Sequence, residues 1–187
     1  MNQLKVITIL LIVIFTASVL KTSTQLTQTP KTEEPENFTA TIIKVVDGDT
    51  IDIKTQNRTD TVRILGIDTP ETYGKNTPSE YYLENTSKNR RCLQKIGEKA
   101  TQLVKNQTKN QKITVKTDPK SDERGTYGRL LAYIQNNQTD IGERLLQKGY
   151  ARLYNSTFTK KLKYHKLQKK ARTNNKGIWN PNCGAAE

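Results

Sequence analysis

The chain has 187 residues, and about 150 of them remain once an apolar N-terminal segment is set aside, enough for one domain with a hydrophobic core. Lysine and arginine total 31 against 18 acidic residues, which gives a formal net charge of +13. This surplus attracts polyanions, either nucleic acid or anionic lipid headgroups. One histidine and two cysteines argue against a metal site built from imidazole or thiolate ligands.

The N-terminus carries an apolar run, residues 6–20, which follows Lys5. The run is shorter than the roughly twenty residues of a membrane-spanning helix, and it matches the core of a signal peptide. Because Ala17-Ser18-Val19 only loosely resembles a cleavage site, residues 1–20 are predicted as a signal peptide or an N-terminal membrane anchor. Residues 21–37 are polar and predict a flexible linker. Both alternatives predict export, as a secreted protein or one anchored to the membrane with its domain outside.

The domain opens with three β-rich segments, at residues 39–46, 50–55 and 61–67. The sequence Asp47-Gly48-Asp49 predicts a turn between the first two, and residues 56–60 predict the second turn.

The rest of the domain mixes helices and strands. After an irregular polar stretch at 72–91, the pattern predicts helices at 93–105, 140–148 and 159–173, strands at 112–117 and 128–135, and an extended segment at 151–154. Five strands with helices between and after them predict an α+β fold that is mainly β, a five-stranded OB-type barrel with about three α-helices. The domain is predicted to span residues 38–180, followed by a C-terminal tail at 181–187, with no internal repeat or second domain visible.

Acidic residues gather at the ends of two predicted strands. Asp49 begins the second strand, while Asp68 and Glu71 follow the third. If these strands pair antiparallel, Asp49 and Asp68 become neighbours, and two such carboxylates repel each other unless a cation lies between them. Oxygen ligands favour Ca²⁺ or Mg²⁺ over Zn²⁺. The alternative is that Asp47 and Asp49 only shape the turn.

Two arginines accompany these acids. Arg63 lies within an apolar strand, where a charge needs a partner or a function, and Arg129 follows Tyr127-Gly128 at the start of another strand. Guanidinium groups match phosphate oxygens and stay charged. A lone strand arginine is often a surface or ion-pair residue, but two beside an acid cluster favour a phosphate site.

Residues 46–50 (VDGDT), 62–71 (VRILGIDTPE) and 127–129 (YGR) closely resemble the staphylococcal nuclease (thermonuclease) family, and the resemblance extends from about residue 38 to residue 179. It implies a Ca²⁺-dependent endonuclease that hydrolyses phosphodiester bonds of DNA and RNA and leaves 3′-phosphate ends. It also implies that Asp49, Asp68 and the carbonyl oxygen of Thr69 bind Ca²⁺.

The resemblance further implies catalytic roles for Arg63, Glu71 and Arg129, in which the arginines neutralise the phosphate and Glu71 activates water. Tyr127 and Tyr154 are the implied substrate-binding residues. The register leaves Tyr150 as an alternative to Tyr154, and either tyrosine could instead pack on the barrel.

The chain departs from the family pattern in two places. Thr126 stands where the family has a lysine before Tyr-Gly-Arg, and residues 76–91 form an insertion without a clear family counterpart. The rival interpretation is a catalytically inactive nucleic-acid-binding module tethered at the cell envelope, but such modules usually lose the acids or arginines that this chain keeps. No protein partner is predicted, and we expect a monomer. Cys92 and Cys183 form either one disulfide or two free thiols.

Overall fold

The structure is a computed structural model that describes residues 36–109 and 111–183. The predicted signal peptide or anchor (1–20), all but the end of the predicted linker, and the last residues of the predicted tail lie outside the described residues. Within the described ranges, no helix combines the length and apolar character that a membrane crossing requires.

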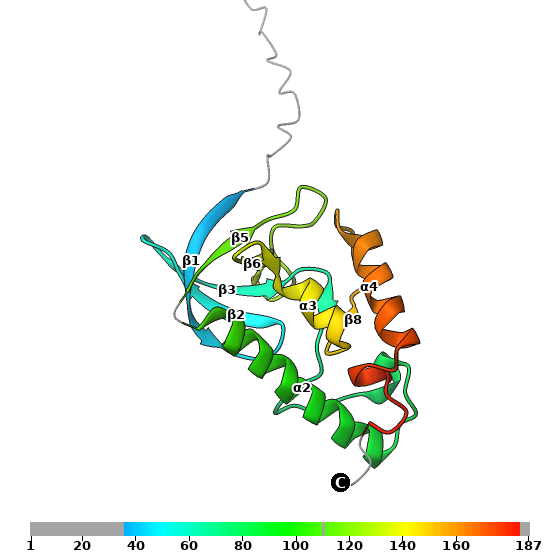
Figure 1. The fold of residues 1–187 in the computed structure, drawn as a ribbon. Helices are drawn as coiled ribbons and strands as arrows, with labels where there is room; N and C mark the ends of the chain where they lie inside the picture. Colours follow the sequence, from blue (N-terminus) through cyan, green and yellow to red (C-terminus); the bar gives the residue numbers. More distant parts are fainter. Residues whose placement is uncertain (1–35, 110, 184–187) are drawn as a thin grey trace, which may run out of the picture. The chain divides into compact units, whose positions relative to one another are not determined.

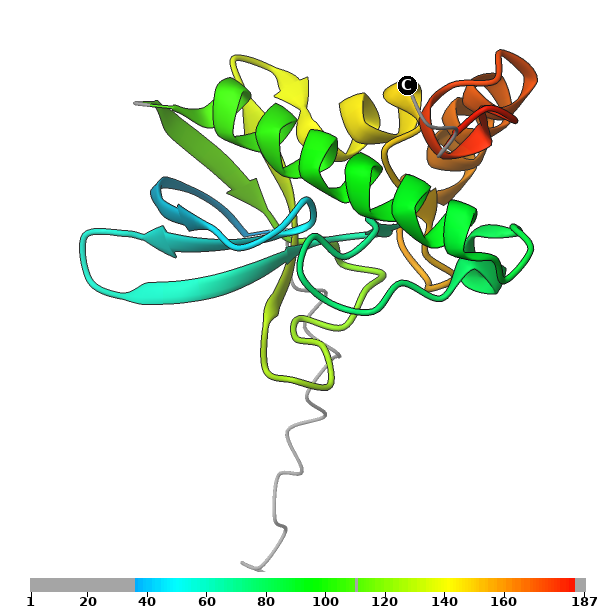
Figure 2. The same ribbon diagram turned by 90° about the horizontal axis from the view of Figure 1, so that it is seen from below.

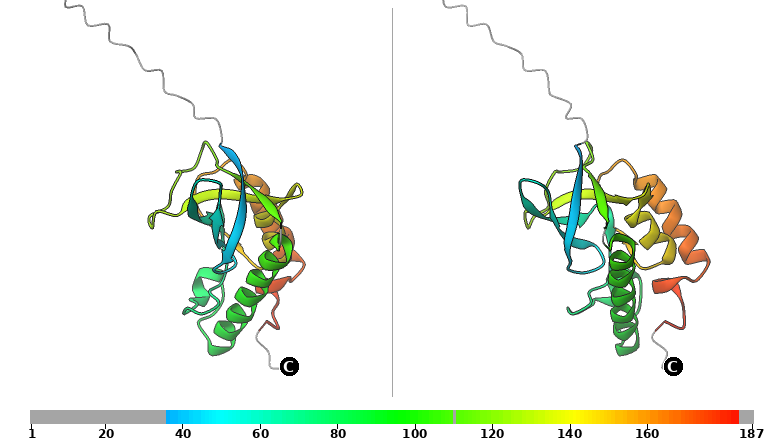
Figure 3. Two further views of the ribbon diagram at one scale, coloured as in Figure 1. Left: turned by 90° about the vertical axis from the view of Figure 1, so that its left-hand side faces the viewer. Right: turned by 60° about the vertical axis from the view of Figure 1, so that its left-hand side comes forward.

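Five strands close into a barrel (Figure 1), as the strand count predicted. They are β1 (Asn37–Val45), β2 (Thr50–Lys54), β3 (Thr59–Ile64), β5 (Lys112–Lys116) and β6 (Leu130–Asn136). β1 lies antiparallel between β2 and β5, β2 pairs with β3, and β5 pairs with β6, all antiparallel. A parallel pairing of β3 with β6, in which Val62 pairs with Leu130, closes the barrel, which Figure 3 shows in two turned views. The expected mainly β, OB-type fold is therefore confirmed.

The predicted third strand is wrong in extent. β3 ends at Ile64, and the chain turns at Gly66, which has a φ of 79°. A Cβ at this glycine would lie 2.4 Å from the ring of Phe158, so both the conformation and the space favour glycine. Beyond the turn, β4 (Ile67–Asp68) leaves the barrel ladder and pairs antiparallel with β8 (Arg152–Leu153). Asp68 therefore lies on a separate short ladder beside the barrel.

Three α-helices occur in the described ranges: α2 (Ser87–Thr108), α3 (Ile141–Lys148) and α4 (Lys161–Thr173). α2 runs beside the barrel (Figure 2). It begins earlier than predicted because the side chain of Thr86 accepts a hydrogen bond from the amide of Asn89 and caps the first turn. Asp140, at the end of the short strand β7 (Thr139–Asp140), caps α3, and Gly149 ends that helix with a left-handed conformation, as its position predicted.

The hydrophobic residues form a main core and a smaller second core. The main core fills the barrel, where alternate strand residues such as Ile51, Ile53, Val62 and Ile64 point inward, and extends under the helices. The second core joins residues of the predicted insertion to α2 and to the short helix η2 (Gly177–Trp179); its buried members are Tyr81, Cys92, Leu93, Ile96 and Ile178.

Cys92 and Cys183 form a disulfide in this second core, with Cα atoms 5.1 Å apart. The pairing resolves the alternative between one disulfide and two free thiols. Because Cys92 lies in the first turns of α2, the disulfide ties the C-terminal segment to that helix.

Candidate active site

The turn before β2 places the first acidic residue. The side chain of Asp47 accepts hydrogen bonds from the amides of Asp49 and Thr50 at 2.9 Å and 2.7 Å, so Asp47 does shape the turn. The antiparallel pairing of β2 with β3 sets Thr50 opposite Arg63. Asp49 therefore lies next to the arginine side chain, and it is only 2% exposed.

Arg63 links the two predicted metal-binding carboxylates. Its Nη1 lies 2.9 Å from Asp49 Oδ1, and its Nη2 lies 2.7 Å from Asp68 Oδ1. The predicted convergence of Asp49 and Asp68 is thus present, with the guanidinium between them. Burial raises the pKa of the Asp49 carboxyl to about 7, although Arg63 acts to lower it. Burial acts to lower the pKa of Arg63, but the two carboxylates outweigh it and raise that pKa overall.

Thr69 and Glu71 follow directly on β4. The Thr69 amide donates to Asp49 Oδ2 at 2.9 Å, which fixes the segment against the β2 turn. Asn76 holds the backbone of Glu71, since its side chain accepts from the Glu71 amide at 2.8 Å and donates to the Glu71 carbonyl at 2.9 Å. Partial desolvation raises the pKa of the Glu71 carboxyl, and the nearby Asp47 and Asp68 carboxylates raise it further.

The second arginine, Arg129, lies next to the strand that closes the barrel against β3. Arg129 precedes β6, and its Nη1 donates to Thr50 Oγ1 at 3.2 Å. The preceding Gly128 has a φ of 73°, and Tyr127 stacks on the Arg129 guanidinium at 5.5 Å. Tyr127 is 84% exposed, so its ring faces solvent at the site.

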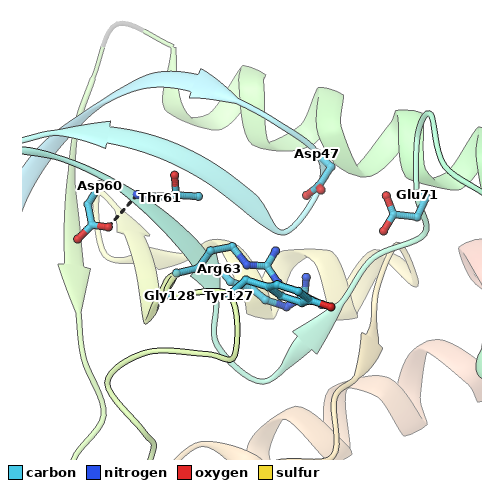
Figure 4. A pocket seen from close by; sticks show the side chains of 8 residues that line it. Asp47, Asp60, Thr61, Arg63, Glu71, Tyr127 and Gly128 are labelled. Carbon is cyan, nitrogen blue, oxygen red and sulfur yellow. Dashed lines mark hydrogen bonds between the residues drawn. The ribbon is translucent and has the colours of Figure 1, made fainter.

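Arg63, Glu71 and Arg129 line one open cleft of about 590 Å³, whereas Asp49 and Asp68 bond to Arg63 and are not part of its lining. Figure 4 shows Asp47 and Glu71 on one side of the cleft, with Arg63 and Tyr127 beneath them. Residues that line the cleft are Asp47, Asp60, Thr61, Arg63, Glu71, Tyr127, Gly128 and Arg129. The three predicted catalytic residues therefore meet at one place, although they come from separate segments of the chain.

The two candidate tyrosines near β8, Tyr150 and Tyr154, have different surroundings. Tyr154 lies over Arg63, with the guanidinium carbon 5.9 Å from the ring centroid, and its amide donates to the Gly66 carbonyl at 3.0 Å. Tyr150 instead packs partly buried against both hydrophobic cores. Of the two registers that the sequence left open, the structure places Tyr154 at the site.

Sequence reasoning missed two residues that contact Asp68. Arg152 Nε lies 2.9 Å from Asp68 Oδ2, and the Tyr81 hydroxyl donates to the same oxygen at 3.1 Å. Local sequence carries no signal for these contacts, because they depend on the β4–β8 pairing and on the fold of the insertion.

The side chains predicted to bind metal, Asp49 and Asp68, both carry oxygen donors and both bond to Arg63. Across residues 36–109 and 111–183, no group of three or more His, Cys, Asp or Glu side chains is close enough to hold a metal ion. The oxygen donors that the structure brings together are the two carboxylates that share Arg63, and the Thr69 amide bonds to one of them. Such oxygen donors fit Ca²⁺ or Mg²⁺, which keep part of their water shell when few protein ligands are available. The Ca²⁺ site stays a prediction.

Comparisons with known proteins point to one family. The family model described as staphylococcal nuclease homologue matches residues 61–181. An uncharacterized protein of Methanocaldococcus jannaschii is 36% identical over 151 residues, which cover 78% of this chain and 73% of that protein. The thermonuclease of Staphylococcus hyicus is 31% identical over 140 residues, covering 74% of this chain and 73% of the thermonuclease. An SPbeta prophage-derived endonuclease of Bacillus subtilis is 34% identical over 145 residues, covering 76% of this chain and 44% of the endonuclease.

Proposed function

Because the chain belongs to the staphylococcal nuclease family and is a hydrolase of nucleic acids, we propose that it is a Ca²⁺-dependent endonuclease that cuts phosphodiester bonds in DNA and RNA and leaves 3′-phosphate ends. The observation that carries this proposal is the cleft lined by Arg63, Glu71 and Arg129, in which Arg63 also bonds to the Asp49 and Asp68 carboxylates. A general base and two guanidinium groups in one open cleft, with two further carboxylates bonded to Arg63, match the needs of phosphodiester hydrolysis.

Asp49, Asp68 and the carbonyl oxygen of Thr69 would hold the Ca²⁺ ion. When bound, the ion supplies positive charge that polarises a phosphate oxygen. Arg63, which bonds to both carboxylates, would have to turn from them toward the phosphate in order to act on it.

Glu71 is the proposed general base. Its carboxyl lies in the cleft and its pKa is raised, both of which suit a group that takes a proton from attacking water. The water oxygen bonds to phosphorus, its proton goes to Glu71, and the bond from phosphorus to the 5′ oxygen breaks. The leaving 5′ oxygen takes up a proton from solvent water, and the phosphate stays on the 3′ side.

Arg63 and Arg129 are proposed to neutralise the charge that grows on the phosphate oxygens. Each guanidinium already lies beside an aromatic ring, Tyr154 for Arg63 and Tyr127 for Arg129. Both tyrosines are substantially exposed, so a base next to a bound phosphate could stack on either ring. We assign Tyr127 and Tyr154 to substrate binding on these grounds.

We also propose that the protein is exported, either secreted or anchored with its domain outside. The disulfide between Cys92 and Cys183 supports this proposal, because such bonds persist in oxidising compartments. Cell fractionation tests it, since a protein that stays in the cytoplasm with reduced cysteines would contradict export.

Digestion of single-stranded DNA by the purified protein, with Ca²⁺ and with a chelator, tests the proposed activity. Glu71→Gln and Arg129→Ala are each expected to lower kcat by about 10²–10³-fold, or roughly 3–4 kcal/mol of barrier. Glu98→Gln and Arg144→Ala, which change exposed helix residues, serve as matched controls and should keep the wild-type rate. Tight binding of DNA without cleavage under any divalent ion would make the chain a binding module instead.

A further inference from the structure

Asp68 has two carboxylate oxygens, and they face different partners. Oδ1 accepts from Arg63, as described above. Oδ2 accepts from Arg152 Nε at 2.9 Å and from the Tyr81 hydroxyl at 3.1 Å. Arg152 stands opposite Asp68 in the β4–β8 ladder, whereas Tyr81 ends the short helix η1 (Pro78–Tyr81) in the insertion. Donors on both sides therefore fix the plane of this carboxylate.

The two donors are themselves held in place. The Arg152 guanidinium lies over the Tyr81 ring at 5.1 Å, and its Nη2 is 3.5 Å from Glu80 Oε2. Tyr81 is only 3% exposed, and its ring packs in the second core with Cys92. The Tyr81 hydroxyl is thus presented to Asp68 by a buried and disulfide-linked part of the fold.

We propose that Tyr81 and Arg152 are positioning residues that orient the Asp68 carboxylate for the metal ion. The proposal rests on the assignment of Asp68 as a metal ligand made above. Groups that hydrogen-bond a metal ligand from behind hold it at the right angle, and their loss typically weakens metal binding 10–100-fold. Through these contacts the insertion at residues 76–91 becomes part of the metal site.

A variant of Tyr81 tests the orientation of Asp68 without changing the charge at the site. Arg152 orients Asp68 but also brings a positive charge that repels a cation, so deleting its charge has two opposing effects. The Tyr81 hydroxyl is neutral and provides orientation alone. Tyr81→Phe removes this one hydrogen bond and keeps the ring that fills the second core. Arg152→Lys keeps the charge while it removes the fixed guanidinium donor.

Tyr133 offers a matched control in the main core. Its hydroxyl also donates to a buried carboxylate, that of Asp118, and its ring is 2% exposed. Tyr133→Phe therefore deletes the same kind of bond, together with a longer one from the Lys160 amide at 3.3 Å, at a place where Asp68 is not involved. A purely structural role for Tyr81 predicts that both phenylalanine variants lower the melting temperature and leave metal binding unchanged.

Calorimetric titration of the full-length protein with Ca²⁺ alone tests the proposal. We expect Tyr81→Phe and Arg152→Lys to raise the Kd for Ca²⁺ by about 10-fold, and Tyr133→Phe to leave it unchanged. Nuclease activity of Tyr81→Phe should return toward the wild-type rate at saturating Ca²⁺. If Tyr81→Phe binds Ca²⁺ with the same Kd as the wild type, this proposal is wrong while the proposed Ca²⁺ dependence still stands. A wild-type protein that binds no Ca²⁺ overturns both this proposal and the Ca²⁺ dependence above.

Discussion

Gly97 in α2 lies directly against the segment that carries Glu71. A Cβ built on this residue would lie 2.4 Å from the Pro70 carbonyl oxygen and 3.0 Å from that of Glu71. Both contacts are with main-chain atoms, which cannot rotate away as a flexible side chain can. Since Cβ contacts under 3.0 Å are essentially never seen, a Gly97→Ala substitution must displace α2 from residues 70–71 by at least 3.0 − 2.4 = 0.6 Å.

Two opposing effects set the expected stability of Gly97→Ala. Alanine is favoured over glycine inside a helix by about 1 kcal/mol, whereas overpacking of this kind costs about 1–3 kcal/mol. We expect a net loss of about 1 kcal/mol in the free energy of unfolding. Activity should suffer more, because a misplacement of about 1 Å near a catalytic group can cost about 10²-fold; a shift near 0.6 Å predicts at least a roughly tenfold lower kcat/KM.

Urea unfolding and initial rates on single-stranded DNA measure the two quantities. Gly125→Ala is the stability control, because its added methyl would meet Leu131 Cδ2 at an ordinary 3.5 Å. This control should be as stable as the wild type or slightly more stable. A Gly97→Ala protein that is more stable than the wild type and cleaves at the wild-type rate would refute the reasoning.

Four further predictions concern stability, pH, substrate binding and the metal. Replacing Cys92 and Cys183 by alanine removes a disulfide that joins residues 91 positions apart, and it should lower the free energy of unfolding by about 2–4 kcal/mol. A urea unfolding curve with the same midpoint as the wild type would contradict this. Burial acts to raise the pKa of Asp118, but hydrogen bonds from hydroxyl and main-chain donors lower that pKa overall. The stability that the ionised Asp118 gives to the folded protein is therefore fully present above its ordinary pKa of 3.8. This stability is lost as the pH falls through the lower pKa of the folded state. Asp118→Asn should therefore lower the free energy of unfolding by about 2–3 kcal/mol at pH 7. Urea unfolding at a series of pH values should show that the difference in this free energy between the variant and the wild type becomes smaller in strong acid. Arg124 donates to the Gly128 carbonyl at 2.7 Å beside the cleft, so Arg124→Ala should raise KM in steady-state assays while stability changes by less than about 1 kcal/mol. Ca²⁺ at 100 times its Kd should stabilise the protein by about 2.7 kcal/mol, and thermal melts that are identical with Ca²⁺ and with chelator would count against the metal site.

Much of the barrel and the acid cluster follows from local sequence. Alternation of apolar residues in segments such as 50–55 marks which side chains face a core, since a strand side chain changes face at every residue. The turn at residues 56–60 predicts that the second and third strands pair antiparallel, and such pairing brings the start of one strand beside the end of the next. Antiparallel pairing of the second and third strands predicted Asp49 beside Asp68, and Arg63 was predicted separately as a charge in an apolar strand that needs a partner or a function.

Tertiary structure decided how those groups are partnered. Arg63 lies between the carboxylates where local reasoning expected a cation, and Arg152 reaches Asp68 across 84 residues of sequence. The break of the third strand at Gly66, the contact of Tyr154 rather than Tyr150 with Arg63, and the bond of Tyr81 to Asp68 depend on barrel closure, the β4–β8 ladder and the second core. Local patterns encode backbone geometry and burial, whereas contacts between distant segments exist only once the packed fold sets their distance and direction.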